Sequence, residues 1–180
     1  MADRDRSDSE FFRPFAVDSL GEAELAREIE AGPAECQAVA RRLGLESLSG
    51  LRARFRLARA GGGALVRVLG HFEADVVQLC VVSLEPVGQH LAEDFGVTYS
   101  LAPVSTQDDL ELTLADEDLP EEALDGIIDL GEAAVQQLAI ALDPYPRRPD
   151  AEVPAALSPA ENGPLGPFAA LAKLKGDKQA

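Results

Sequence analysis

The residues best suited to chemistry in this chain are two cysteines and two histidines. A nucleophilic thiol needs an imidazole within hydrogen-bond reach and a third group that orients the imidazole. Cys80 falls near the end of an expected strand, His71 and His90 fall on expected sheet positions, and no protease or hydrolase motif surrounds them. We therefore expect no catalytic residue. A Cys80-dependent transferase or hydrolase is the weakest interpretation of the chain.

A zinc site is the second chemistry to consider. Cys80 and Ser83 stand at the spacing of a zinc knuckle, but the second position carries a hydroxyl instead of a sulfur. A structural zinc ion needs about four ligands at close spacing. The glycines at 61–63 lie between two expected strands, whereas a phosphate-binding loop joins a strand to a helix. We expect no metal, no cofactor and no small-molecule substrate, and we expect Cys36 to be a core thiol.

Charge is distributed unevenly along the sequence. The net charge of −16 arises between Val68 and Pro146, where seventeen Asp and Glu occur without one Lys or Arg. A field of one sign in one region attracts partners of the opposite charge and disfavours non-specific binding to phosphate. Within that stretch, the block from Asp108 to Glu132 lacks any local counter-charge. We expect a basic partner to bind the acids Asp108, Asp109, Glu111, Asp116, Glu117, Asp118, Glu121, Glu122 and Asp129.

Three arginines form the densest basic surface that the sequence predicts. Arg52, Arg54 and Arg56 alternate with apolar residues, which is the pattern of a half-buried antiparallel strand. They would either contact RNA phosphates or pair across a hairpin with Glu73 or Asp75. The pairing is the favoured interpretation, because the hairpin register brings these acids next to the arginines.

Two helices are expected before this strand. Ser19 and Glu22 have the spacing of a capping box and predict a first helix that ends at Gly32. Pro33 suits the first position of a second helix, which Gly44 would end.

A long β-hairpin is expected next, with its turn at 61–63, and a third strand is expected to add to its sheet after Pro86. Residues 104–128 have little periodicity and predict an acidic, solvated connection with at most a short helix after Pro120. Asp129 is the expected N-cap of the last helix, which ends before Pro144. The buried face of that helix should contain Val135, Leu138, Ala139 and Leu142.

This order of elements predicts an α+β domain over residues 1–148, with an antiparallel sheet packed against N-terminal and C-terminal helices. Residues 149–166 are rich in Pro, Ala and Gly and predict a tether. Residues 167–180 predict a short basic amphipathic segment. Its apolar face, formed by Phe168, Leu171 and Leu174, is expected to dock on the core or on a partner, and Lys173 and Lys175 would be its RNA contacts.

The cellular location follows from what the sequence lacks. No apolar run of about eighteen residues could span a bilayer, and the first ten residues are charged where a signal peptide needs an apolar segment. Two cysteines are too few for a disulfide framework. We expect a soluble cytoplasmic protein.

Three segments in this order resemble the YceD family, bacterial and plastid proteins required for accumulation of large-subunit ribosomal RNA. They are Cys80-x-x-Ser83-Leu84-Glu85-Pro86, then Ile128-Asp129-Leu130 followed by a helix to Leu142, Pro144 and Pro146, and finally Pro167-Phe168-Ala169-x-Leu171-x-x-Leu174-Lys175. With the arginine-bearing strand, the resemblance spans the chain from about Phe12 onward. Many members carry a second sulfur where Ser83 stands, and further cysteines after the prolines, whereas no cysteine follows Cys80 here.

The resemblance implies a non-enzymatic factor that supports accumulation of large-subunit (23S-type) ribosomal RNA and ribosome biogenesis. Because RNA repels a protein with a charge of −16, the factor is expected to bind a basic ribosomal protein or assembly factor, with any contact to ribosomal RNA indirect. The alternative is an acidic interaction module that masks the nucleic-acid surface of a basic protein outside ribosome assembly.

Overall fold

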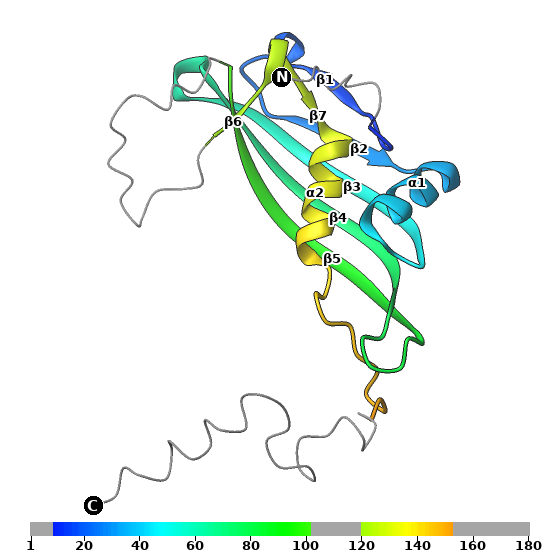
Figure 1. Ribbon diagram of the computed structural model, residues 1–180. Coiled ribbons are helices and arrows are strands. Elements are labelled where there is room, and N and C mark those ends of the chain that lie inside the picture. Colours follow the sequence, from blue (N-terminus) through cyan, green and yellow to red (C-terminus); the bar gives the residue numbers. More distant parts are fainter. Residues whose placement is uncertain (1–8, 102–119, 153–180) are drawn as a thin grey trace, which may run out of the picture.

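The computed structural model describes residues 9–101 and 120–152 (Figure 1). Its main sheet has the strand order β2-β3-β4-β5-β6. The bounds are β2 Leu25–Glu30, β3 Ser47–Ala60, β4 Leu65–Leu79, β5 Pro86–Ser100 and β6 Glu121–Glu122. Strands β3, β4 and β5 are antiparallel to their neighbours, as predicted, and β2 is an additional antiparallel strand, whereas β6 runs parallel to β5. The described chain is therefore an α+β fold with a mixed sheet.

Smaller elements complete the fold. Strands β1 (Pro14–Ala16) and β7 (Ile127–Asp129) form a separate antiparallel ribbon. The α-helices of the described ranges are α1 (Pro33–Leu43) and α2 (Leu130–Ala141). Single turns of 3₁₀ helix in the same ranges are η2 (Val17–Ser19), η3 (Gly61–Gly63) and η4 (Leu124–Gly126).

The predicted hairpin is confirmed as β3 and β4, joined at η3. Alternate side chains of both strands are buried, because successive residues of a strand point to opposite faces. The inward side chains are Leu51, Ala53, Phe55 and Leu57 on β3, and Val66, Val68, Phe72, Ala74 and Val76 on β4. Gly62 has a φ of 68° in the turn, a backbone conformation that residues other than glycine rarely adopt.

The prediction of a helix that ends at Gly32 is wrong, because this segment forms β2. Leu25 and Ile29 pair with Leu57 and Ala53 across the β2–β3 ladder. A spacing of four residues returns to the same side of a strand as well as of a helix, so the short apolar pattern fitted both. Ser19 caps no helix, and its hydroxyl donates to the carbonyl of Ala16. Pairing with β3, at the edge of the hairpin, thus outweighs the local helix signal in this segment.

Both other helices begin and end as their local signals predict. The Glu35 carboxylate accepts the N–H of Gly32 at the start of α1 (2.8 Å), and Gly44 ends that helix with a φ of 67°. Asp129 caps α2 by accepting the N–H of Gly131. The prediction that Ala139 is buried is wrong, because the face of α2 turned to the core runs through Leu130, Ala133, Ala134, Val135 and Leu138.

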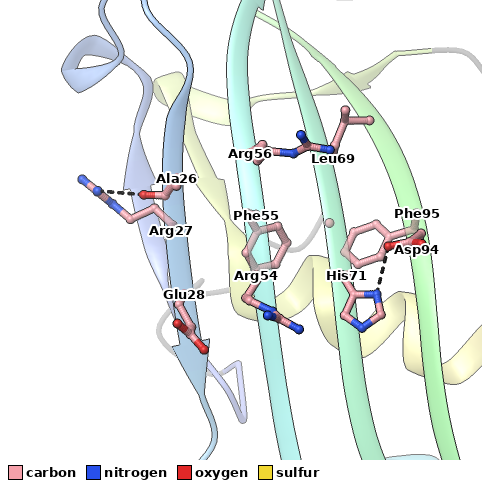
Figure 2. Close-up of a pocket in the computed structure, with 11 residues that line it drawn as sticks. Ala26, Arg27, Glu28, Arg54, Phe55, Arg56, Leu69, His71, Asp94 and Phe95 are labelled. Atoms are coloured by element: carbon pink, nitrogen blue, oxygen red, sulfur yellow. Dashed lines mark hydrogen bonds and ion pairs between the residues drawn. The ribbon is translucent and has the colours of Figure 1, made fainter.

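Helices α1 and α2, the β1–β7 ribbon and the inward face of the sheet share one apolar core. In Figure 1, α2 lies over β4 and β5, and α1 lies beside β3. The opposite face of the sheet, here called the open face, has no described element packed against it (Figure 2). Neither helix of the described chain is long and apolar enough to cross a membrane.

The described part of the predicted acidic connection is more regular than expected. Residues 120–129 contain β6, η4 and β7, and the only helix after Pro120 and before Asp129 is the single turn η4. The rest of that connection, and most of the predicted tether with the segment 167–180, lie outside the described residues.

Candidate interaction surfaces

The open face carries a row of charged side chains that crosses four strands. Arg54 of β3 lies opposite Glu28 of β2 and His71 of β4, and His71 lies opposite Asp94 of β5. Figure 2 shows the imidazole turned toward Asp94, with Nδ1 and Oδ1 2.9 Å apart. The register of the four strands produces this row. An acid stands at each end of it, and Arg54 and His71 lie between the two acids.

A groove lies next to this row. Ala26, Arg56 and Leu69 occupy adjacent positions on β2, β3 and β4, and they line a hollow of about 740 Å³ together with Arg54 and His71 (Figure 2). The Arg56 side chain extends toward Leu69 (Figure 2), and 40% of Leu69 is exposed. The groove therefore offers an apolar contact between cationic groups.

On the core-facing side of the sheet, below the groove, a glycine leaves space for the ring of a neighbouring strand to lie over it. Gly70 lies opposite Phe95, and a Cβ atom at Gly70 would lie 2.2 Å from the Phe95 ring. The ring packs edge-on against Phe55, with centroids 5.8 Å apart, and lies 6.3 Å from that of Phe72. These three rings attach β5 to the two strands before it.

The three arginines of β3 have different partners. Arg52 donates to Glu73 through Nε (3.2 Å) and Nη2 (2.5 Å), and Arg54 donates to the same carboxylate (3.2 Å). The hydrogen bond from Arg52 lowers the pKa of Glu73. The predicted cross-hairpin pairing is thus confirmed for Glu73. Asp75 instead lies 2.8 Å from His90. The Arg56 side chain makes no hydrogen bond or ion pair with any described residue.

Five acids of the block from Asp108 to Glu132 lie in the described residues, and one of them, Asp125, is exposed in η4. Glu121 and Glu122 are exposed on β6. Asp129 uses Oδ1 to accept the N–H groups of Gly131 (3.0 Å) and Arg13 (2.8 Å), so this carboxylate organises the chain locally. Glu132 binds Arg42 of α1 through two hydrogen bonds.

The expectation that this whole block lacks a counter-charge is therefore wrong for Glu132. Arg42 stands 90 residues away in sequence and is brought close by the packing of α1 and α2. The pairing raises the pKa of Arg42. No pattern in the sequence identifies Arg42 as the partner.

The remaining predicted site residues lie outside the described ranges. They are the acids Asp108, Asp109, Glu111, Asp116, Glu117 and Asp118, the apolar residues Phe168, Leu171 and Leu174, and the lysines Lys173 and Lys175.

The turn between β4 and β5 wraps around the Cys80 thiol. Its Sγ accepts the N–H groups of Val82 and Ser83, each at 3.4 Å, and the side chain is buried. Hydrogen bonds from the Ser83 side chain, the Arg148 backbone and the Ser83 backbone lower the pKa of Cys80 to about 6. The segment after α2 closes the turn, with the Val81 N–H donating to the carbonyl of Pro146.

These contacts stabilise a thiolate without supplying a base or a metal site. Both imidazoles lie against carboxylates, as the Asp94 and Asp75 contacts above show. Among residues 9–101 and 120–152, no group of three or more His, Cys, Asp or Glu could hold a metal ion. Cys36 is buried in the core, with Sγ 3.7 Å from the carbonyl of Ala31.

Comparison with known proteins gives one finding. The family model described as large ribosomal RNA subunit accumulation protein YceD matches residues 68–175, more than half of the chain. No curated protein and no solved structure matches the chain. The matched range begins within β4 and includes the Cys80 turn, β5 and α2.

Proposed function

The chain belongs to the YceD family, and from this premise we propose that it is a non-enzymatic, cytoplasmic factor that supports accumulation of large-subunit ribosomal RNA by binding a basic ribosomal protein or assembly factor. The family match over residues 68–175 is the observation that carries this proposal. The matched range includes the segments that carried the sequence resemblance, including Cys80-x-x-Ser83.

Charge supports a protein partner over direct RNA binding. The stretch from Val68 to Pro146 contains every unit of the net charge of −16. At ordinary ionic strength, such a field repels phosphate and raises the association rate of a basic partner. The exposed Glu121 and Glu122 are described members of the acidic surface that this partner would meet.

Direct RNA contact is a second mechanism, favoured by one observation on the open face. Arg56 has no acidic partner among the described residues, and Arg54, although paired with Glu73, has 61% of its side chain exposed. Two guanidinium groups beside the exposed Leu69 would suit a phosphate and a neighbouring base. The nearby acids Glu28 and Asp94 oppose this mechanism.

Depletion of the protein tests the function. Cells lacking it should show a lower ratio of large to small ribosomal subunits on sucrose gradients and less large-subunit RNA relative to small-subunit RNA. Restoring the chain from a plasmid should restore both ratios. Unchanged large-subunit RNA after depletion would contradict the proposed function.

Affinity capture with and without nuclease tests the mechanism. A basic ribosomal protein or assembly factor should remain bound after nuclease and should dissociate as salt is raised. Loss of the partner on nuclease treatment would favour RNA contact through Arg54 and Arg56. Capture of DNA-binding proteins without ribosomal ones would favour the alternative of a masking module outside ribosome assembly.

A further inference from the structure

Within residues 9–101 and 120–152, strand β5 leaves a long edge of the main sheet unpaired. It pairs with β4 over all fifteen residues without a break in register, whereas the pairs described on its outer side are those of Tyr99 and Ser100 with β6. In Figure 1, no described element lies beside the rest of that outer side. We refer to the outer side of residues 86–98 as the β5 edge.

The direction of the backbone groups along the β5 edge can be assigned. The carbonyl of Ser100 accepts the N–H of Ala123, so Ser100 points away from β4. The N–H of Leu101 donates to Ala64, on the β4 side. Because the N–H and C=O of one residue point the same way and the direction alternates, the residues that present backbone groups at the edge are Gly88, His90, Ala92, Asp94, Gly96 and Thr98.

This edge lacks most of the features that usually prevent a strand from pairing with another chain. Natural edges are shortened, interrupted by bulges or proline, covered with lysine, or given a charge on the core-facing side, and of these residues 87–98 have only the charge of Glu93. After Pro86, β5 contains no further proline and no Lys or Arg, and its ladder with β4 has no bulge. The unpaired stretch is also long enough for a complete added strand.

The side chains along the edge include two acids and several apolar residues, with Gln89, His90 and Thr98 as polar neighbours. Glu93 is exposed on the helix side, and Asp94, 90% exposed, lies on the open face. Leu91, Phe95 and Val97 are half-buried at the rim of the core. An added strand would cover these apolar side chains and place its own residues next to the two carboxylates.

We propose that the β5 edge binds an extended, basic segment of a partner protein, which adds to the sheet as a further strand. The main-chain hydrogen bonds would hold the segment, and alternate Lys or Arg side chains would lie on the open face near Asp94. The side chains between them would lie on the helix side, next to Leu91, Phe95 and Val97. The proposal rests on the proposed function in taking the partner to be basic. A second copy of this chain is a poorer occupant, because its own edge carries the same acids.

Binding of a defined peptide tests this proposal without cells. The probe is a blocked, fluorescent ten-residue peptide that alternates Lys and Val, measured by anisotropy at two salt concentrations. Ala92→Pro removes one outward N–H from the edge without removing a hydrogen bond to β4. We expect about tenfold weaker binding, since the proline also blocks close approach of the added strand.

Ala26→Pro is the matched control on the opposite edge of the sheet. Ala26 is exposed, and its carbonyl is free to accept Arg27, which shows that its backbone groups point away from β3. This variant should bind the peptide as tightly as the parent chain does. Circular dichroism and thermal melts establish that both variants are folded.

A modified probe keeps the test independent of protein folding. The same peptide, N-methylated at four consecutive central residues, retains its charge but cannot pair along either side, so it should not bind measurably. Equal binding of both peptides, or of the parent and Ala92→Pro chains, would overturn the proposal. So would a dimer of the free chain that Ala92→Pro dissociates. These results do not depend on the depletion phenotype, which tests the proposed function separately.

Discussion

The main sheet has two long edges of different kinds, one formed by β2 and the other by β5. The outer side of β2 is six residues long, and the guanidinium of Arg13 covers part of it by donating to the carbonyl of Glu30 (3.1 Å). The β5 edge is longer, carries the acids Glu93 and Asp94, and has no Lys or Arg along it. The difference suggests that β2 closes the sheet, whereas β5 leaves it ready to accept another strand.

The largest effect should come from detaching β5. Gly70→Ala would force the Phe95 ring away from its position against Phe55, because the new Cβ would lie 2.2 Å from the ring. We expect a loss of about 2 kcal/mol in the free energy of unfolding, measured by urea denaturation. Gly88→Ala is the control, because nothing lies within 4 Å of its added Cβ. Equal stability of Gly70→Ala and the parent would contradict this account of how β5 is held.

The next effect concerns the protection of the β2 edge. Arg13 binds Glu35 through two hydrogen bonds of 2.8 Å and lies 4.4 Å from the centre of the Phe11 ring. Arg13→Ala should reduce the free energy of unfolding by about 1–2 kcal/mol and accelerate amide exchange along β2.

Arg13→Lys serves as its control. A lysine keeps the charge but cannot make the two-pronged contact with Glu35, so it should restore only part of the stability. Unchanged exchange along β2 in Arg13→Ala would show that the guanidinium does not protect this edge.

Charge at the β5 edge should have a smaller effect, seen in binding alone. The double variant Glu93→Gln/Asp94→Asn should weaken capture of a basic partner about fivefold at low salt and less at high salt. Glu22→Gln/Glu24→Gln removes the same charge from exposed positions before β2 and should leave capture nearly unchanged. If both double variants weaken capture equally, net charge and not the β5 edge attracts the partner.

Whether a feature of the fold or of the interaction surfaces could be predicted from the sequence depends on how far apart in the chain the interacting residues lie. The ends of α1 and the N-cap of α2 were predictable, because Pro33, Gly44 and Asp129 act within a few residues. The pairing of Arg52 with Glu73 was predictable from a hairpin register. The strand β2 was not, since its spacing fitted a helix equally well. The open β5 edge was not either, because it depends on which strand is last.

A pH measurement examines the turn from which β5 begins. The contacts from Ser83 and Arg148 lower the pKa of Cys80 to about 6, whereas a cysteine in an unfolded chain titrates near about 8.5. The folded state is therefore stabilised fully above the unfolded pKa, and this stabilisation is lost as the pH falls through about 6. Thiolate absorbance at 240 nm should rise near pH 6.

Substitution identifies the thiol that titrates. The absorbance step should disappear in Cys80→Ala and persist in Cys36→Ala. The difference in melting temperature between the parent and Cys80→Ala should be nearly constant below pH 6 and should grow between about pH 6 and pH 8.5. Cys80→Ala should also restore large-subunit RNA in depleted cells, as expected of a non-enzymatic factor; failure of a folded variant to do so would support a chemical role for the thiol.

The smallest effect on stability is expected at Arg56, and it separates the open face from both edges. Arg56 has no ion pair with a described residue, so Arg56→Ala should change the free energy of unfolding by less than about 0.5 kcal/mol. Its peptide binding should match that of the parent chain, because the β5 edge is two strands away. If the open face binds phosphate, nuclease-sensitive RNA recovered with the protein should fall. Weaker peptide binding by Arg56→Ala would place the basic segment on the open face and not along the β5 edge.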